Sequence, residues 1–298
     1  MWLVLLVMVL AMEAQAALMI VCTTPDLASI ARSIAGNHGQ VFSLAKPTED
    51  PHFVDAKPSF IARLNKADLL IEGGAELESG WLDPLVVGAR NSRIATGGPA
   101  RVSCAKGIQM LNVPSQLDRS QGDVHAAGNP HYMMDPVNAL IASEHIGSAL
   151  SRVDGAHATE YQRNRAAFEA EIKSKLRAWE ELLSPYKGQH LVAYHNTWPY
   201  FAKRFGLKSE LFLEPKPGIP PTPTHLNKTI TTMKSVAAKV IAVEPYQSRK
   251  TAEKVATESG AQVLEVAQYP GGFKGSGEDY ISLMDSLVKG MAKKFANH

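Results

Sequence analysis

The chain is organised around the segment Gly128-Asn129-Pro130-His131-Tyr132-Met133-Met134-Asp135-Pro136, which presents a histidine on a turn just before a helix. The Asn-Pro pair favours a turn and restricts the backbone ahead of His131. Asp135 is a suitable N-cap residue, and Pro136 fits the first position of the helix that follows. We therefore expect the imidazole of His131 on a stiff loop at the start of a helix, not on a mobile surface segment.

Two further histidines have comparable surroundings, in Asp50-Pro51-His52 and in Ala193-Tyr194-His195-Asn196. Each lies between a strand-like and a helix-like segment. A single histidine of this kind is more often a structural residue, but three of them favour one shared metal site. Three imidazoles and one carboxylate would satisfy the preference of zinc for about four N, O or S ligands, and they disfavour magnesium or calcium.

The carboxylate ligand is less clearly indicated by the residues themselves. Glu244 ends a strand-like run, and the adjacent pair Glu278-Asp279 follows a glycine-rich loop. Glu244 could equally cap a helix or accept a hydrogen bond from a ligand imidazole. His125 lies in a polar loop, from which it could contact a metal transiently.

The N-terminal half alternates between strand-like and helix-like segments. Ala17–Cys22 is a short, continuous apolar run, as expected of a parallel strand that is covered on both faces. A helix follows from Pro25, a strand at Gln40–Leu44, a helix at Pro58–Ala67 and a strand at Asp68–Ile71. This order predicts an α/β fold with a mainly parallel sheet.

Ala156–Leu183 is the longest helical segment, with almost no glycine or proline and one apolar stripe. At 1.5 Å per residue it would be ~40 Å long, enough to run along two lobes. A second strand–helix series follows it, with strands at His190–Tyr194, Leu211–Leu213, Val240–Val243 and Gln262–Val266 and a closing helix at Tyr280–Ala296. We expect two Rossmann-like lobes, residues 17–153 and 187–298, joined by a rigid helical connection at 154–186, with a ligand cleft between them.

Residues 1–16 have the pattern of a secretory signal peptide. The apolar run from Trp2 to Met12 is too short to span a membrane, and Ala14-Gln15-Ala16 resembles a cleavage site, although a basic start is missing. A lipid anchor at Cys22 is disfavoured because Val21 stands where such sites need a small residue. We expect an exported, soluble protein.

The net charge, the cysteines and the absence of common catalytic motifs argue against nucleic-acid binding, a disulfide framework and several enzyme classes. The 298 residues carry a formal net charge of +2, which gives no sign of a nucleic-acid partner. Cys22 and Cys104 could pair in an oxidising compartment, but their surroundings favour two core thiols. The sequence contains no nucleophile elbow, no His-Glu-x-x-His and no phosphate-binding loop.

Several segments together resemble the zinc/manganese solute-binding proteins of bacterial ABC importers. The resemblance covers nearly the whole chain after residue 16 and keeps the order of the segments. It is carried by Asp50-Pro51-His52-Phe53, Lys57-Pro58-Ser59, Gly128-Asn129-Pro130-His131-Tyr132, Asp135-Pro136, His195, Tyr200-Phe201-Ala202-Lys203-Arg204-Phe205-Gly206-Leu207, Val243-Glu244-Pro245 and Thr251-Ala252-Glu253.

This resemblance implies two α/β lobes, one long rigid helix and a single metal between the lobes. By motif, the ligands fall on His52, His131, His195 and Asp279, with Glu278 as the alternative to Asp279. The implied protein is a monomeric periplasmic receptor, not an enzyme. It would carry Zn²⁺ as its transported ligand to an ABC transporter permease in the inner membrane.

One departure from the family concerns the loop at Pro114–Gly128, where many zinc-specific members have a long His/Asp-rich insertion. Here it holds only Asp118, Asp123 and His125, which weakens the case for loop-assisted capture. Manganese or iron is the alternative cargo, although a third histidine favours zinc. A secreted zinc hydrolase would also need an open coordination position and a general base. An adhesin would need an anchor that the sequence does not show.

Overall fold

The computed structural model describes residues 17–116, 122 and 124–297. The expected signal peptide at residues 1–16 lies outside this part of the chain, as do Asp118 and Asp123 of the polar loop. Within the described residues, no helix combines the length and the apolar character needed to cross a membrane.

The N-terminal lobe contains a four-stranded parallel sheet in the order β2-β1-β3-β4. Its strands are β1 (Leu18–Cys22), β2 (Gly39–Ser43), β3 (Leu69–Glu72) and β4 (Arg101–Ser103). Ile20, Val21 and Cys22 of the inner strand β1 are fully buried. Helices cover both faces of this sheet, which explains the continuous apolar run of β1.

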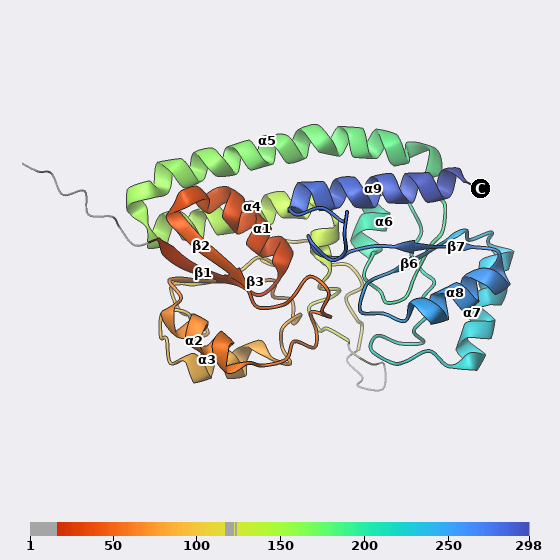
Figure 1. The fold of residues 1–298 in the computed structure, drawn as a ribbon, viewed down its shortest axis with the longest axis horizontal. Coiled ribbons are helices and arrows are strands. Elements are labelled where there is room, and N and C mark those ends of the chain that lie inside the picture. The colour runs from red at the N-terminus through yellow and green to blue at the C-terminus, as the bar shows by residue number, and fades with distance from the viewer. Residues whose placement is uncertain (1–16, 117–121, 123, 298) are drawn as a thin grey trace, which may run out of the picture.

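Alternate residues of β1 enter two different cores. Ile20 and Cys22 pack in the core formed with α1 (Pro25–Ala35) and α4 (Pro136–Val153), whereas Val21 packs with α2 (Pro58–Lys66) and α3 (Leu82–Ala89). The two pairs of helices lie on opposite faces of the sheet in Figure 1. Cys22 and Cys104 are buried and unpaired, as predicted.

The C-terminal lobe repeats this plan with a parallel sheet in the order β5-β6-β7. Its elements are β5 (Leu191–Ala193), α6 (Pro199–Phe205), α7 (Pro223–Ser235), β6 (Val240–Val243), α8 (Arg249–Ser259) and β7 (Gln262–Glu265). Ile230 of α7 and Val255 of α8 share one core with the sheet, while Phe201 of α6 packs in the other. The expected two-lobe α/β architecture is confirmed.

The predicted strand Leu211–Leu213 forms only an isolated bridge, which joins Phe212 to Ala193 at the edge of β5. The Ala193 amide donates to the Leu211 carbonyl, and the Leu213 amide donates to the Ala193 carbonyl, both at 3.0 Å. The pairing stops there because Pro215 and Pro217 follow and have no amide hydrogen to donate. The segment therefore extends the sheet without becoming a regular strand.

The long helix α5 (Ala158–Leu183) runs beside α9 (Tyr280–Ala296) across both lobes (Figure 1). Asp285 of α9 accepts hydrogen bonds from Lys175 and from the indole of Trp179, both 2.7 Å long. The core that contains Ile20 of β1 continues past both helices to Leu191 of β5. The predicted connecting helix is confirmed, and it shares one apolar core with both lobes.

Candidate metal centre

His52, His131 and His195 come together at one point in the described structure. Each can offer a ring nitrogen such that the three nitrogens lie within 4.8 Å of one another. Their ring centroids are 5.1 to 5.5 Å apart, and the rings meet edge to face. The Nε2 atoms of His52 and His131 are buried and have no hydrogen-bond partner among the described residues. Converging nitrogens without partners are the donor set that a transition metal requires.

The position of each histidine is set by the secondary-structure element next to it. His52 and His195 lie in the loops that leave β2 and β5, at the carboxyl ends of the two parallel sheets, where α/β folds bind ligands. His131 stands directly before a 3-10 turn and α4. Asp135 caps α4 as predicted, since its carboxylate accepts a hydrogen bond from the Val137 amide. The same carboxylate binds Arg204 of α6 at 2.8 and 2.9 Å, which ties this loop to the other lobe.

The Nδ1 atoms of the three rings each have a hydrogen-bond partner of their own. Nδ1 of His52 lies 2.8 Å from Oδ1 of Asp50, and Nδ1 of His195 lies 2.8 Å from Oε2 of Glu214. Nδ1 of His131 lies 2.9 Å from the side-chain amide of Gln268. A carboxylate that accepts the Nδ1 proton leaves the lone pair on Nε2, and this is the usual way in which proteins orient an imidazole toward a metal.

Electrostatics keep His131 neutral. Burial lowers its pKa well below the ordinary value, and the nearby His52, His195 and His125 lower it further. Burial alone would raise the pKa of Asp50, but the hydrogen bond and the charge of His52 bring it below the ordinary value. A neutral imidazole is the form that binds a metal, so His131 is in its ligating charge state without a metal-driven loss of a proton.

Two small cavities reach the cluster from different sides. One, of about 200 Å³, is lined by His52, His195, Phe53 and Tyr246 among others. The second, of about 140 Å³, is lined by His131, His195 and His125 among others. The ring of His125 stacks on that of His52 with centroids 5.2 Å apart, so this loop histidine lies beside the cluster. A small ion therefore has access to the three nitrogens.

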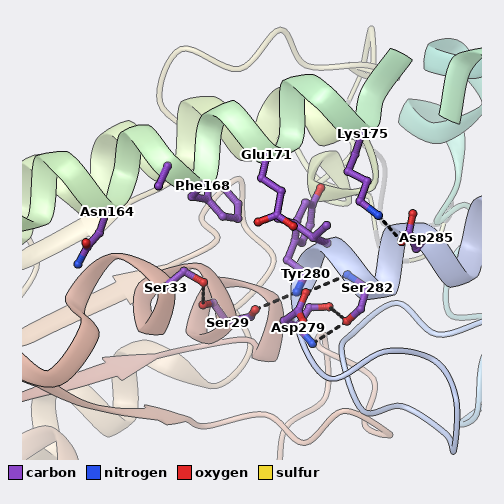
Figure 2. A pocket seen from close by; sticks show the side chains of 12 residues that line it. Ser29, Ser33, Asn164, Phe168, Glu171, Lys175, Asp279, Tyr280, Ser282 and Asp285 are labelled. Carbon is purple, nitrogen blue, oxygen red and sulfur yellow. Dashed lines mark hydrogen bonds and ion pairs between the residues drawn. The ribbon is translucent and has the colours of Figure 1, made fainter. Parts of the chain in front are cut away.

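The structure does not bring Asp279 or Glu278 to this group of histidines. Asp279 is the N-cap of α9, where its carboxylate accepts the Ser282 amide at 2.8 Å in a capping box. It lines a separate cavity of about 510 Å³ between α1, α5 and α9, which also contains Glu171 and Lys175 (Figure 2).

The glycine-rich loop before α9 folds back on itself, which explains this placement of Asp279. The Gly271 amide donates to the Gly277 carbonyl at 2.7 Å, so the loop closes before it can extend toward the histidines. The Tyr280 amide then donates to Ser29 of α1 at 2.9 Å, which fixes the start of α9 beneath α5. The position of Asp279 therefore supports the capping alternative and not ligation.

We expect Asp279→Ala to lower the free energy of unfolding by about 1 kcal/mol, the usual effect of losing an N-cap. Zinc affinity should change less than threefold, because the carboxylate is not in the histidine group. Chemical denaturation and a zinc titration on the same variant would test both expectations. Glu278→Ala serves as a neighbouring control without the capping contact. A tenfold loss of zinc affinity in Asp279→Ala alone would restore it as a ligand.

Glu244 is buried near the site but outside the ligand group. Trp198 donates its indole N–H to Oε1 of Glu244 at 3.0 Å, while Oε2 has no partner among the described residues. Burial raises the pKa of Glu244 to about 7, although the charge of His195 and the hydrogen bond from Trp198 oppose this shift. Glu244 therefore holds the segment that follows His195 through Trp198, and it is not part of the histidine group.

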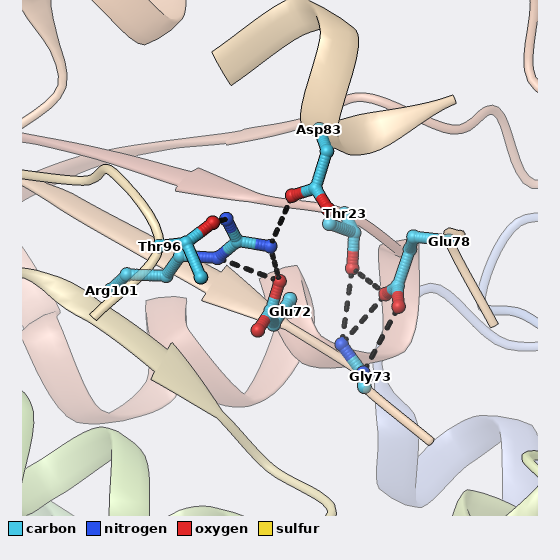
Figure 3. Close-up of polar contacts among 8 residues, drawn as sticks. Thr23, Glu72, Gly73, Glu78, Asp83, Thr96 and Arg101 are labelled. Atoms are coloured by element: carbon cyan, nitrogen blue, oxygen red, sulfur yellow. Dashed lines mark hydrogen bonds and ion pairs between the residues drawn. The ribbon is translucent and has the colours of Figure 1, made fainter. Parts of the chain in front are cut away.

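A second buried carboxyl group, on Glu78, lies in the same lobe as His131 and organises the loop at Gly73 (Figure 3). Glu78 accepts hydrogen bonds from the Thr23 hydroxyl at 2.6 Å and from the amides of Gly73 and Gly74 at 2.7 and 3.0 Å. The carbonyl of Gly73 in turn accepts the Tyr132 hydroxyl at 2.7 Å. The residue next to His131 is thus anchored to the loop that Glu78 organises.

Glu78 should make stability depend on pH. Burial raises its folded pKa to about 7, above the ordinary 4.5. Folding therefore favours the protonated form, and this contribution is complete below about pH 4.5 and is lost as the pH rises through 7. We expect Glu78→Gln to reduce the fall in unfolding free energy between pH 5 and pH 7 by about 2 kcal/mol. Urea denaturation at several pH values would measure this, with the exposed Glu181→Gln as control; identical pH slopes in Glu78→Gln and the unmodified chain would contradict it.

Comparisons with known proteins agree with this geometry. Residues 20–294 match the model of a family described as zinc-uptake complex component A, periplasmic. The iron-binding protein YfeA of Yersinia pestis is 33% identical over 285 residues, covering 93% of this chain and 86% of the relative. The iron ABC transporter substrate-binding lipoprotein MtsA of Streptococcus pyogenes serotype M1 is 24% identical over 292 residues, covering 93% and 89%.

Solved structures share the fold. A crystal structure of ZnuA has a TM-score of 0.79 at 24% identity and covers 93% of this chain and 99% of that one. A manganese-bound periplasmic metal-binding protein from Candidatus Liberibacter asiaticus has a TM-score of 0.76 at 22% identity, covering 92% and 98%. Because the family model matches nearly the whole described chain, this protein belongs to the periplasmic zinc-uptake component A family and is a metal-binding component of an ABC importer.

Proposed function

We propose that the chain binds one Zn²⁺ through the Nε2 atoms of His52, His131 and His195 and delivers it to a membrane permease. The supporting observation is that two of these nitrogens are buried without partners beside the third. The two cavities next to the histidines leave room for a water molecule as the fourth ligand. Asp279 is left out of this ligand set because it caps α9.

Zinc is favoured by the chemistry of the donor atoms. The group contains three imidazoles and no carboxylate, and imidazole-rich sites suit zinc better than manganese, which binds carboxylates and water more readily. Iron or manganese is the second candidate, since one relative is named as an iron-binding protein and a similar structure holds manganese. The carboxylates of Asp50 and Glu214 lie nearby, but both are engaged by histidine rings.

We further propose a transport role without catalysis, in which a monomer works in the periplasm with an inner-membrane permease and its ATPase. A zinc hydrolase would need a free general base beside the metal. The carboxylates closest to the rings hold Nδ1 atoms instead. We propose lobes at residues 17–153 and 187–298, joined by the connection at 154–186.

Export by a cleaved signal peptide is also part of the proposal. Some relatives are named lipoproteins, so an anchored form is the alternative. In this fold Cys22 is buried in the pairing region of β1, where a lipid would displace the strand from β2 and β3. N-terminal sequencing of the exported protein should place the start after Ala16.

Metal binding provides the central test. Protein purified without added metal and then titrated with Zn²⁺, Mn²⁺ and Fe²⁺ in competition should retain one equivalent of zinc. Its melting temperature should rise with zinc, because a ligand that binds only the folded state stabilises it by about 4 kcal/mol at 1,000 times Kd. The absence of a thermal shift at saturating zinc would contradict the proposal. Preferential retention of iron or manganese would show that this metal, and not zinc, is the transported ion.

A further inference from the structure

The three histidines of the proposed zinc site differ in what holds their outer nitrogens, and the following inference rests on that proposed site. Asp50 and Glu214 hold His52 and His195 with carboxylates, which only accept hydrogen bonds when ionised. His131 instead meets the amide of Gln268, which carries an acceptor at one end and two donor hydrogens at the other. Among the three, His131 alone has an electrically neutral partner in the described structure.

This difference determines which tautomers each ring can adopt. A carboxylate requires a proton on Nδ1, so His52 and His195 keep a lone pair on Nε2 for the metal. Gln268 lies with its NH₂ group 2.9 Å from Nδ1 of His131. A donor in that position requires a lone pair on Nδ1, which moves the proton of the neutral ring to Nε2. In this tautomer His131 cannot bind a metal through Nε2.

The opposite tautomer is available after a half-turn of the same amide. The Gln268 oxygen would then accept the Nδ1 proton, and the lone pair would return to Nε2. At its other end, the Gln268 oxygen now accepts the Tyr246 hydroxyl at 3.0 Å. After the turn, the NH₂ group would donate to the same Tyr246 oxygen, because a phenol both donates and accepts. Both hydrogen bonds are therefore kept in both orientations.

Burial limits the Gln268 amide to two orientations. Gln268 is only 4% exposed, so water does not compete freely for its amide. An unpaired amide would be costly at this depth, and the two satisfied orientations are therefore favoured over any intermediate one. The Gln268 amide, with Tyr246 behind it, is an element with two discrete states that lies one hydrogen bond from a proposed ligand.

We propose that Gln268 and Tyr246 are positioning residues that let His131 exchange between a zinc-binding and a non-binding tautomer. His52 and His195 are fixed for binding, whereas His131 completes the site only in part of the population. The apparent zinc affinity is reduced by that fraction, because the competent state must be populated before it binds. The arrangement keeps the apparent zinc affinity lower than three carboxylate-held histidines would allow.

Nuclear magnetic resonance can observe the tautomers directly. Long-range ¹H–¹⁵N correlation spectra of the zinc-free full chain should show the Nε2–H form of His131 as a populated species. The same spectra should show only Nδ1–H for His52 and His195. Adding zinc should convert His131 to Nδ1–H. An exclusive Nδ1–H form of His131 in the zinc-free protein would overturn the inference.

Gln268→Glu provides the matched variant, since it keeps the length of the side chain but presents only acceptors. We expect His131 to become Nδ1–H without zinc, and the zinc affinity measured in competition with a chromophoric chelator to rise about tenfold. The added charge alone could tighten binding, but it would not by itself explain a tautomer change in the zinc-free state. An unchanged tautomer or an unchanged zinc affinity would contradict the proposal.

The reciprocal variant is Glu214→Gln, which gives His195 the kind of partner that His131 has. We expect the Nε2–H tautomer of His195 to appear in the zinc-free protein and the zinc affinity to fall. If the Nε2–H tautomer of His195 does not appear in this variant, the amide does not control the tautomer of the ring. These outcomes are separate from the proposed function: if the unmodified chain binds no zinc, the site assignment fails, whereas normal zinc binding with unresponsive tautomers removes only the role of Gln268.

Discussion

Replacing His131 by alanine should weaken zinc binding by a factor of 100 or more. The change removes one of three converging nitrogens. Altering an outer partner of a metal ligand typically costs about 10- to 100-fold in affinity, so loss of the ligand itself should cost at least as much. Equilibrium competition with a chelator of known affinity, at fixed pH, would measure the change.

The fold should tolerate this replacement. His131 is 3% exposed, and its Nε2 has no partner among the described residues, so the substitution removes one hydrogen bond, that between Nδ1 and the Gln268 amide. The loss of one such hydrogen bond costs about 1 to 3 kcal/mol, which is small for a chain of this size. We expect the metal-free melting temperature to stay within a few degrees of the original value. If the metal-free protein loses as much unfolding free energy as the variant loses in zinc-binding free energy, His131 has a structural role instead.

His125→Ala is the matched control for this prediction. It removes an imidazole that stacks on His52 and lines one of the adjoining cavities, but that lies outside the ligand group. We expect less than a threefold change in zinc affinity. If His125→Ala weakens binding as much as His131→Ala, the ligand set must be extended to the loop histidine.

The convergence of the three histidines could be predicted because each lies next to a local sequence signal. His131 precedes an Asp-Pro helix start, and His52 and His195 follow strand-like runs. Parallel strands place their carboxyl ends at one edge, so such loops come together even when they are distant in the chain. The long helix α5 could be predicted because its sequence has almost no glycine or proline and carries one apolar stripe.

The partners of the histidine rings could not be predicted in this way. Asp50 is two residues from His52, but Gln268 contacts His131 across 137 positions of sequence. Nothing near Gln268 distinguishes it from an ordinary residue after a strand. Asp279 is the opposite case: its family position and glycine-rich loop predict a ligand, whereas loop closure and helix capping place its carboxylate at the start of α9. The strand β4 has only three residues, too few for a recognisable period.

Replacing Trp198 by alanine should have the largest effect on stability, at about 3 to 5 kcal/mol. The side chain is fully buried and packs edge to face on Phe201, with ring centroids 5.7 Å apart. Its removal leaves a large cavity in the core shared by both lobes. It also removes the indole N–H that Oε1 of Glu244 accepts, which leaves that buried carboxyl group without this hydrogen bond.

Trp198→Phe separates the two contributions to this effect. It keeps most of the apolar contact but cannot donate to Glu244, so we expect a smaller loss, of about 1 to 3 kcal/mol. Because Trp198 lies between His195 and α6, both variants should also weaken zinc binding, the alanine variant more strongly. Urea denaturation of the metal-free proteins, followed by zinc titration where the variant is folded, would measure both effects. A Trp198→Ala variant as stable as the original would mean that the core closes around the lost indole, and that the packing of Trp198 does not hold the segment after His195 in place.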